Sequence, residues 1–423
     1  MTARRRRPPG EGSVFEYKLA DGTLRYGIKF DAPTPDGERK QVLRRIDSNG
    51  QPWLDRDSAT AALRESVVKA GKNEWIDPSK QPLGEYLHTW LDGKRIAPGS
   101  VTTYQNLTDN HVIPYIGSIP LASITSARLS KLYRDLEDSG HRDRKGKRTG
   151  KPLSPRTVRL VHVMLHGALD AAVDAEPPLL AKNPTAKADP PTVKEADAAA
   201  PEIHPWTAPQ LRRFLDWSRQ DKANTGRWPY VLWLLLAYTG MRRGEALALR
   251  WRDIDLDAAT VSVRRSVRIV RVKGKKATLR EGPTKTAKPR VIDLDPFTVA
   301  ALRTWKTIRG LLALQLARDD AVVLGDEEGR FLNPESVSRR FREQQQRCAR
   351  HLAADAVPVI RLHDLRHTHA TILLRDRENV KIVSERLGHA SVVTTLRVYH
   401  HVMPGDQRQA AARFAELVSG TGA

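Results

Sequence analysis

The C-terminal part of the chain carries two histidine-containing blocks ahead of a tyrosine: His363-Asp364-Leu365-Arg366-His367, then Leu387-Gly388-His389-Ala390-Ser391, then Tyr399. Glycine commonly ends a helix, and serine or threonine commonly begins one. Gly388 is therefore expected to end one helix, and Ser391 or Thr394 to begin the next. This arrangement places His389 at a corner and Tyr399 about ten residues further along the chain.

The first block is typical of a helix that begins at an anion site. If a helix starts here, His363 and Arg366 share one face while Leu365 points to the core. An imidazole beside a guanidinium is suited to hold a phosphate. The histidines and Asp364 are also candidates for a metal site, but no cluster of carboxylates or cysteines at ligand spacing accompanies them. The remaining alternative is that these histidines are ordinary core residues.

Two basic stretches precede these blocks. The first stretch is Thr239-Gly240-Met241-Arg242-Arg243-Gly244-Glu245. It predicts a tight turn at Gly240 and a following helix with Arg242 at its start. Glu245 is expected to be structural, paired with a neighbouring cation. The second stretch is Pro283-Thr284-Lys285-Thr286-Ala287-Lys288-Pro289-Arg290, which indicates a basic hairpin segment. From such a hairpin, Lys285 can reach a DNA backbone or donate a proton. Solvent-facing arginines and a charged exposed turn are the alternatives.

The charge of the chain points to a polyanionic partner. The net charge of the 423 residues is +22, and the sequence pI is near 10.2. Residues 201–423 carry 39 Lys and Arg against 24 Asp and Glu, so a folded domain holds most of the surplus. This distribution favours nucleic acid as the partner, with a ribosomal or merely highly charged protein as the alternative.

The composition predicts a cytoplasmic, soluble protein. Cys348 is the one cysteine, which excludes an intrachain disulfide framework and a multi-cysteine zinc site. The longest apolar run, Tyr230 to Tyr238, is about half as long as a membrane-spanning helix, so it reads as a buried core helix. We therefore expect no contact with a membrane.

The chain is long enough for two or three domains. Strand patterns at 13–18, 24–30 and 41–46 and a helix at 57–72, capped by Asp57 or Ser58, predict a small domain over residues 1–77. Helical spacing predicts an α-helical domain over 78–190. Within it, six of the eleven residues 141–151 are Lys or Arg, which makes this loop a candidate for phosphate contact. A proline-rich extended linker, with 191–205 as its last part, leads into a mixed domain that reaches residue 423.

The four stretches described above follow one another in a specific order along the chain. Taken together, Arg242, Lys285, His363 with Arg366, His389 and Tyr399 resemble the signature of the tyrosine recombinases, or phage-integrase family. The resemblance is close over residues 205–403. Over 1–190 it rests on layout alone and implies an arm-type DNA-binding domain (1–77) and a helical, SAM-like core-binding domain (78–190), ahead of a catalytic domain (191–423). The implied fold is mainly α with small β-sheets.

The resemblance implies a mechanism without metal or cofactor. Arg242 and Arg366 would clamp the phosphate, Lys285 would protonate the leaving 5′ oxygen, and His363 and His389 would assist. Tyr399 would be the nucleophile that forms a 3′-phosphotyrosine. Lys288 is the alternative to Lys285, and Ala390 and His369 depart from the residues common in the family.

The implied function is site-specific integration or excision of a phage or mobile element. The expected partners are double-stranded DNA with attachment sites, three further copies of the chain in a homo-tetramer, and an excisionase or DNA-bending accessory protein. Residues 406–418, with a periodic apolar face, are a candidate contact between protomers; the alternative is an amphipathic helix that covers the chain's own core. The alternatives are a type IB topoisomerase-like enzyme and a non-catalytic DNA-binding protein.

Overall fold

A computed structural model describes residues 12–33, 39–47, 51–71, 81–143, 146–199, 202–221, 228–270, 277–284, 289–353, 356–400 and 407–419. The chain divides into two compact units, Met1–Pro201 and Glu202–Ala423. The fold is mainly α-helical with small antiparallel sheets, which confirms the predicted fold class. Each unit is described by itself.

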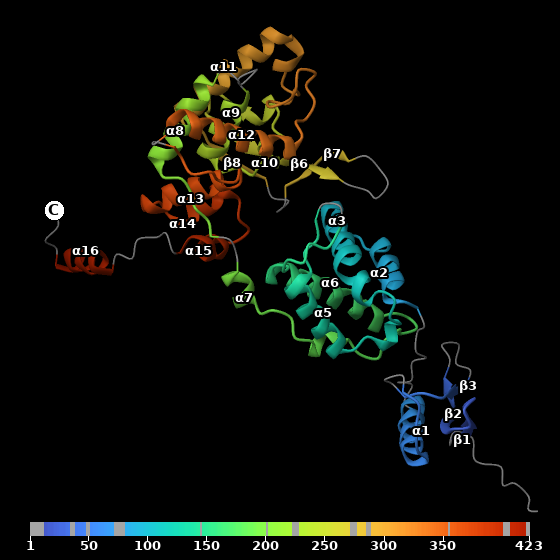
Figure 1. Cartoon of the computed structure of the whole chain (residues 1–423). Helices are drawn as coiled ribbons and strands as arrows, with labels where there is room; N and C mark the ends of the chain where they lie inside the picture. Colours follow the sequence, from blue (N-terminus) through green and yellow to red (C-terminus); the bar gives the residue numbers. More distant parts are fainter. Residues whose placement is uncertain are drawn as a thin grey trace, which may run out of the picture. The chain divides into compact units, whose positions relative to one another are not determined.

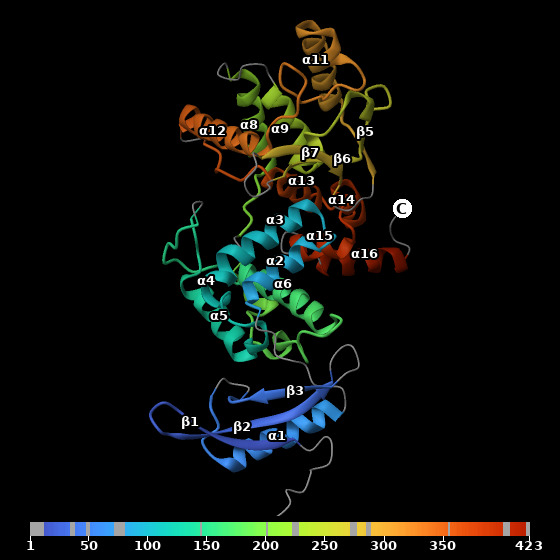
Figure 2. The same ribbon diagram turned by 90° about the vertical axis from the view of Figure 1, so that its right-hand side faces the viewer.

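The first unit begins with a three-stranded sheet covered by one helix. The strands pair antiparallel in the order β1 (Ser13–Lys18), β2 (Leu24–Pro33) and β3 (Arg39–Arg44), and α1 (Arg56–Gly71) lies against one face (Figure 2). Ile28, Phe30 and Leu63 form the centre of the shared core. The predicted helix cap is wrong: the backbone N–H of Ser58 donates to Oδ1 of Asp55 at 2.7 Å, because α1 starts one residue earlier than expected.

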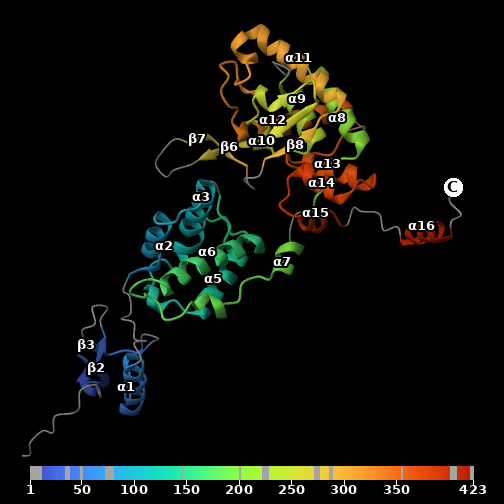
Figure 3. The same cartoon turned by 180° about the vertical axis from the view of Figure 1, so that it is seen from behind.

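The rest of the first unit contains a helical bundle (Figure 3). Its elements are α2 (Leu83–Asp92), α3 (Pro98–Leu107), a π-helical turn (Thr108–Val112), α4 (Ile113–Ile116), a 3₁₀ turn (Leu121–Ser123), α5 (Ser126–Ser139) and α6 (Pro155–Val173). Thr125 and Ser154 accept backbone N–H groups at the starts of α5 and α6. Their side chains satisfy donors that a helix start leaves unpaired, so the sequence places these two helices well.

The predicted extended linker is partly folded. A 3₁₀ turn (Pro184–Lys187) and α7 (Val193–Ala198) interrupt it, and Thr192 and Glu195 cap α7 reciprocally. The segment also packs on the bundle, since Nη1 of Arg159 donates to the carbonyl of Pro191 at 2.5 Å. The extended linker was the wrong expectation here because a proline at the first position of a helical turn favours that turn, and a capping box starts a helix.

The second unit mixes helices with short strands (Figure 1). Its helices are α8 (Ala208–Gln220), α9 (Trp228–Thr239), α10 (Arg243–Ala246), a 3₁₀ turn (Trp251–Asp253), α11 (Pro296–Leu312), a 3₁₀ turn (Leu314–Ala317), α12 (Pro334–Leu352), α13 (Asp364–Arg375), α14 (Val380–Leu387), α15 (Val392–Tyr399) and α16 (Gln407–Ser419). Its strands are β4 (Ile254–Asp255), β5 (Thr260–Val263), β6 (Arg265–Val270), β7 (Thr278–Pro283) and β8 (Arg290–Asp293).

The strands form two separate sheets. β4, β5 and β8 pair antiparallel in that order, while β6 and β7 form a two-stranded hairpin. The sequence predicted strands at β5, β6 and β8 but not β7, whose charged residues hide the alternation of a strand. Strand β7 ends at Pro283, the first residue of the predicted basic hairpin segment, and residues 285–288 of that segment lie outside the described residues.

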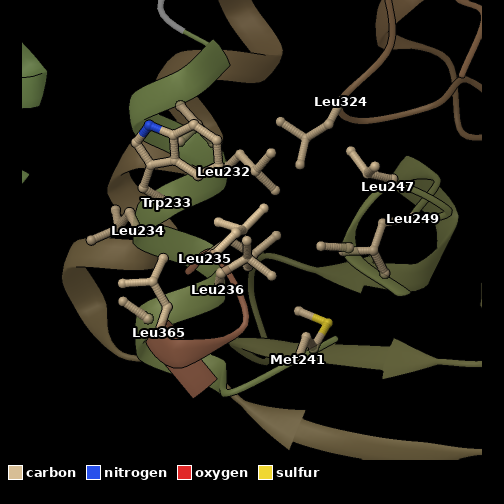
Figure 4. Close-up of a cluster of buried hydrophobic side chains, with 14 of the residues drawn as sticks. Leu232, Trp233, Leu234, Leu235, Leu236, Met241, Leu247, Leu249, Leu324 and Leu365 are labelled. Atoms are coloured by element: carbon tan, nitrogen blue, oxygen red, sulfur yellow. The ribbon is translucent and has the colours of Figure 1, made fainter. Parts of the chain in front are cut away.

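Helix α9 is the centre of the second unit. Leu232, Trp233 and Leu235 are fully buried, and Figure 4 shows them beside Leu247 and Leu324. A helix that is apolar on every side is stable only when protein surrounds it. The predicted buried core helix is thus confirmed, and in the described part of the chain no helix is long and apolar enough to cross a membrane.

The strand-like segment before α13 is fixed by one glutamine. Gln345 of α12 is fully buried, its Oε1 accepts the N–H of Ile360 at 2.8 Å, and its Nε2 donates to the carbonyl of Ile360 at 3.0 Å. Both backbone groups are satisfied by this single side chain. The position of the segment that leads to His363 therefore depends on Gln345.

We expect Gln345→Leu to destabilise the second unit by about 2–4 kcal/mol, because it leaves two backbone groups buried without partners. The measurement is urea-induced unfolding of the full chain, followed by hydrogen exchange of peptides from α12 and α13. The neighbouring Gln346 is exposed, so Gln346→Leu is the matched control. Equal stability of the two variants would show that Gln345 does not hold this segment.

Candidate active site

Arg242 follows a sharp turn at the end of α9. Gly240 has a φ of +63°, and a Cβ there would lie 2.8 Å from a ring carbon of His369, so both the backbone and the space favour glycine. Arg242 precedes α10, where its backbone N–H donates to Oε2 of Glu245 at 3.0 Å and its Nη1 donates to Oε1 at 2.9 Å. The turn predicted at Gly240 is present, and it delivers Arg242 to the site.

Glu245 is a buried carboxylate between two guanidiniums. It is 1% exposed, and Nη2 of Arg290 donates to its Oε2 at 2.7 Å. Burial raises the pKa of Glu245, but the hydrogen bond and charge of Arg290 and the contacts with Arg242 outweigh burial, so the net pKa is lowered. The carboxylate is therefore ionised at neutral pH, which fits the predicted pairing of Glu245 with a cation.

Arg366 is a buried cation with an unsatisfied donor. It is 3% exposed, and its Nη1 donates to the carbonyl of Gly240 at 2.7 Å. Its Nη2 has no hydrogen-bond partner within the described ranges. Burial and the charge of Arg242 lower its pKa to about 9, which still leaves it protonated at neutral pH. A buried guanidinium with a free N–H is suited to bind an anion.

His389 lies at the predicted corner between two helices. Gly388 ends α14 with a φ of +66°, and the Ser391 side chain accepts the N–H of Val393 to begin α15. Nδ1 of His389 lies 2.8 Å from the hydroxyl oxygen of Thr395. Burial, together with the charges of Arg366 and Arg242, lowers the pKa of His389 to about 4, so its imidazole is neutral at pH 7.

Tyr399 is the last residue of α15 and is 2% exposed. Burial raises its pKa above the ordinary value although the charge of Arg366 opposes this. Its hydroxyl lies 2.7 Å from Nδ1 of His367. The signature residues predicted from the sequence do not include His367; its position on the helix of Arg366, four residues after His363, was the signal that could have marked it as a residue of the site.

His363 precedes α13 and is exposed. Its ring and that of His367 meet edge to face with their centroids 5.2 Å apart. The surrounding protein atoms exclude water from the ring of His363, which lowers its pKa. The charges of His367 and Arg366 lower this pKa further, so the imidazole of His363 is neutral as well. Leu365, between the two, is fully buried, as predicted.

A basic cleft adjoins these residues. It has a volume of about 640 Å³ and is lined by Arg242 and His363. Its other charged lining residues are Arg243, Arg268, Arg342, Arg361 and Glu335. Arginines thus outnumber carboxylates in the lining, which suits a polyanion with phosphates on either side of a reacting one.

The structure brings five of the six predicted site residues together. Arg366 lies at the centre of the group and interacts electrostatically with Arg242, His363, His389 and Tyr399. Lys285 and its alternative Lys288 lie outside the described residues. Among the residues that are described, no three His, Cys, Asp or Glu are grouped to hold a metal ion. The arrangement can bind a phosphate between guanidiniums beside a tyrosine hydroxyl.

Two family models match the chain. Residues 206–405 match the phage integrase family, and residues 83–136 match the N-terminal SAM-like domain of phage integrases. The chain is 25% identical to the ICEBs1 integrase of Bacillus subtilis over 325 residues, which are 74% of this chain and 78% of that protein.

Solved structures share the fold. The Tn1549 transposon integrase in complex with a circular intermediate DNA has a TM-score of 0.62 at 18% identity, over 79% of this chain and 99% of that one. The lambda integrase tetramer bound to a Holliday junction has a TM-score of 0.53 at 16% identity, over 93% and 96%. From the family matches, the chain belongs to the phage integrase family and is a tyrosine-type site-specific DNA recombinase.

Proposed function

We propose that this recombinase integrates or excises a phage or other mobile element, and that Tyr399 forms the covalent 3′-phosphotyrosine. The observation that carries the proposal is the buried Tyr399 hydroxyl in the electrostatic field of Arg366, whose Nη2 is unpaired within the described residues. A relative at 25% identity is named an integrase of an integrative element, which supports the biological role.

The two arginines stabilise the charge that develops on the phosphate. The guanidinium groups of Arg242 and Arg366 can bind the non-bridging oxygens, which gain charge as the tyrosine attacks. Glu245 neutralises part of the local charge while holding Arg242 through its Nη1. Loss of one such preorganised donor typically costs about 3–4 kcal/mol of transition-state stabilisation.

Cleavage forms one P–O bond and breaks another. The oxygen of Tyr399 bonds to phosphorus, and the bond to the 5′ oxygen breaks. Lys285, or Lys288 in its place, donates a proton to that oxygen, while the neutral imidazoles of His363 and His389 contact the phosphate. The phenolate is a better leaving group than an alkoxide, so an incoming 5′ hydroxyl can displace it and reseal the strand without ATP.

The first unit supplies further DNA contacts in this proposal. Two arginines of the basic loop contact other residues of this unit: Nε of Arg142 donates to the carbonyl of Asn110, and the exposed Arg148 lies 4.3 Å over the ring of Tyr115. Lys147 and Lys151 remain exposed and are free to reach phosphates. These two lysines would add phosphate contacts to the binding of residues 78–190 to the core of the attachment site.

The N-terminal sheet is proposed to bind arm-type DNA sites. On the face opposite α1, Tyr17 pairs with Arg25, Ser13 pairs with Lys29, and Arg45 lies 4.9 Å over the Tyr17 ring. Cations and an aromatic ring on a partly exposed sheet face suit a DNA groove. We propose that residues 1–77 bind these sites in the cytoplasm while four copies assemble on paired attachment sites, with an excisionase or DNA-bending protein setting the direction.

Tyr399→Phe is expected to abolish covalent trapping of a nicked attachment-site DNA, because the nucleophilic oxygen is lost. The measurement is the amount of DNA that remains bound to protein after denaturation. Tyr238 is at the surface of the same unit, so Tyr238→Phe is the matched control and should trap DNA as the wild type does. Undiminished trapping by Tyr399→Phe would refute the assigned nucleophile, and efficient relaxation of arbitrary plasmids would favour a topoisomerase.

Acidification is expected to destabilise the second unit before its carboxylates titrate. Burial holds the pKa of His367, His369 and His389 at about 4 in the folded chain, against about 6.5 when unfolded. The unfolded chain therefore binds more protons between these values, and the free energy of unfolding must fall as the pH drops from 7 towards 4.5. Urea unfolding at pH 7.0 and 5.0 measures it.

His369→Gln is the control for this prediction. His369 is buried, with Nδ1 at 2.9 Å from the carbonyl of Ala237, and glutamine does not titrate. The variant should depend less on pH than the wild type over the same range. Equal stability of the wild type at the two pH values would contradict the neutral buried histidines.

A further inference from the structure

The hydroxyl of Tyr399 has a titratable partner. It lies 2.7 Å from Nδ1 of His367, which is its one hydrogen-bond partner in the described part of the chain. We propose that His367 is a catalytic residue: it orients this hydroxyl and accepts its proton as the tyrosine attacks phosphorus. The inference rests on the proposed role of Tyr399 and extends it to a residue that the family signature quoted above does not contain.

The imidazole is held on a rigid element. His367 lies on α13, whose Leu365 is buried in the core and whose Thr368 accepts the backbone N–H of Trp206 at 3.0 Å. The edge-to-face contact with the ring of His363 limits its rotation from the other side. Catalytic groups need this kind of support to hold a productive geometry.

The other two histidines of the site are not bonded to the tyrosine. Nδ1 of His389 is engaged with the hydroxyl of Thr395, and the exposed His363 contacts His367 rather than Tyr399. Proton transfer requires hydrogen-bond reach between base and nucleophile. Among the three imidazoles, His367 alone meets this condition in the described structure.

His367 is in the form that can accept a proton. The charged or titratable groups that face it are Arg361, His363, Asp364 and Arg366 around the start of α13, His389 after α14, and Tyr399 on α15. Burial lowers the pKa of His367 to about 4; the charge of Asp364 opposes this effect, and the charges of Arg366 and Arg361 add to it. A neutral imidazole has one acceptor nitrogen; with Nδ1 accepting from the phenol, Nε2 carries the hydrogen.

A base is needed because burial raises the pKa of Tyr399 and keeps its phenol protonated. During cleavage the oxygen–phosphorus bond forms, the phenol proton moves to Nδ1 of His367, and the bond to the 5′ oxygen breaks as that oxygen takes a proton from the general acid. Resealing reverses each transfer, so His367 returns the proton to the departing phenolate. The charge of a bound phosphate raises the pKa of the imidazole and makes it a stronger base in the complex.

The test is the single-turnover cleavage rate of a nicked DNA substrate by the full chain, from pH 6.5 to 9. His367→Gln should cleave about a hundredfold more slowly at pH 7, a typical effect of losing a general base. Its rate should rise with pH, because hydroxide then removes the proton, while the wild-type rate stays flat. DNA affinity should be unchanged in both His367→Gln and the exposed control His204→Gln.

Fluorinated tyrosine at position 399 separates a base from a merely structural residue. A fluorotyrosine has a lower phenol pKa, so it should recover much of the lost rate in His367→Gln and give no gain in the wild-type background. A loss that is uniform across pH and not recovered by fluorination would overturn the proposal, as would a wild-type rate in His367→Gln. If the wild type itself forms no adduct at Tyr399, the proposed function fails instead.

Discussion

The structure of the site depends on the ion pairs of Glu245 with Arg242 and Arg290. A carboxylate that is 1% exposed is stable in its charged form only when partners compensate it, and removing one partner of a buried pair is strongly destabilising. Arg242 lies after α9 and Arg290 begins β8, so one buried charge joins two distant parts of the chain. Arg290 also donates from Nε to the carbonyl of Arg386, which fixes the end of α14.

These contacts leave little freedom at the corner that carries His389. Nη2 of Arg242 donates to the carbonyl of Gly388 at 3.4 Å, and a Cβ at position 388 would lie within 2.9 Å of the Arg290 guanidinium. The corner therefore packs against the same two guanidiniums that hold Glu245. Since α15 begins directly after it, the position of Tyr399 follows from the same set of charges. The relative positions of Arg242, His389 and Tyr399 are thus set by contacts within the second unit itself.

Much of this could be predicted from sequence because local rules apply to it. Gly388 as a helix end, Leu365 as a core residue and Glu245 as a paired acid each follow from a residue type in a short pattern. Arg290 as the second partner of Glu245 and His367 as the partner of Tyr399 could not be predicted that way, since each contact joins residues more than thirty positions apart. The charged strand β7 was missed because its pairing with β6, rather than its own alternation, makes it a strand.

The rate of DNA cleavage by Glu245→Gln tests directly whether this carboxylate positions the site. Glutamine keeps the shape of the side chain but removes the charge that holds both guanidiniums. We expect single-turnover cleavage of a nicked substrate to slow by about a hundredfold, the effect of a small misplacement of catalytic groups, while DNA affinity stays near that of the wild type. A Glu245→Gln protein that is folded, binds DNA and cleaves it at the wild-type rate would contradict the account.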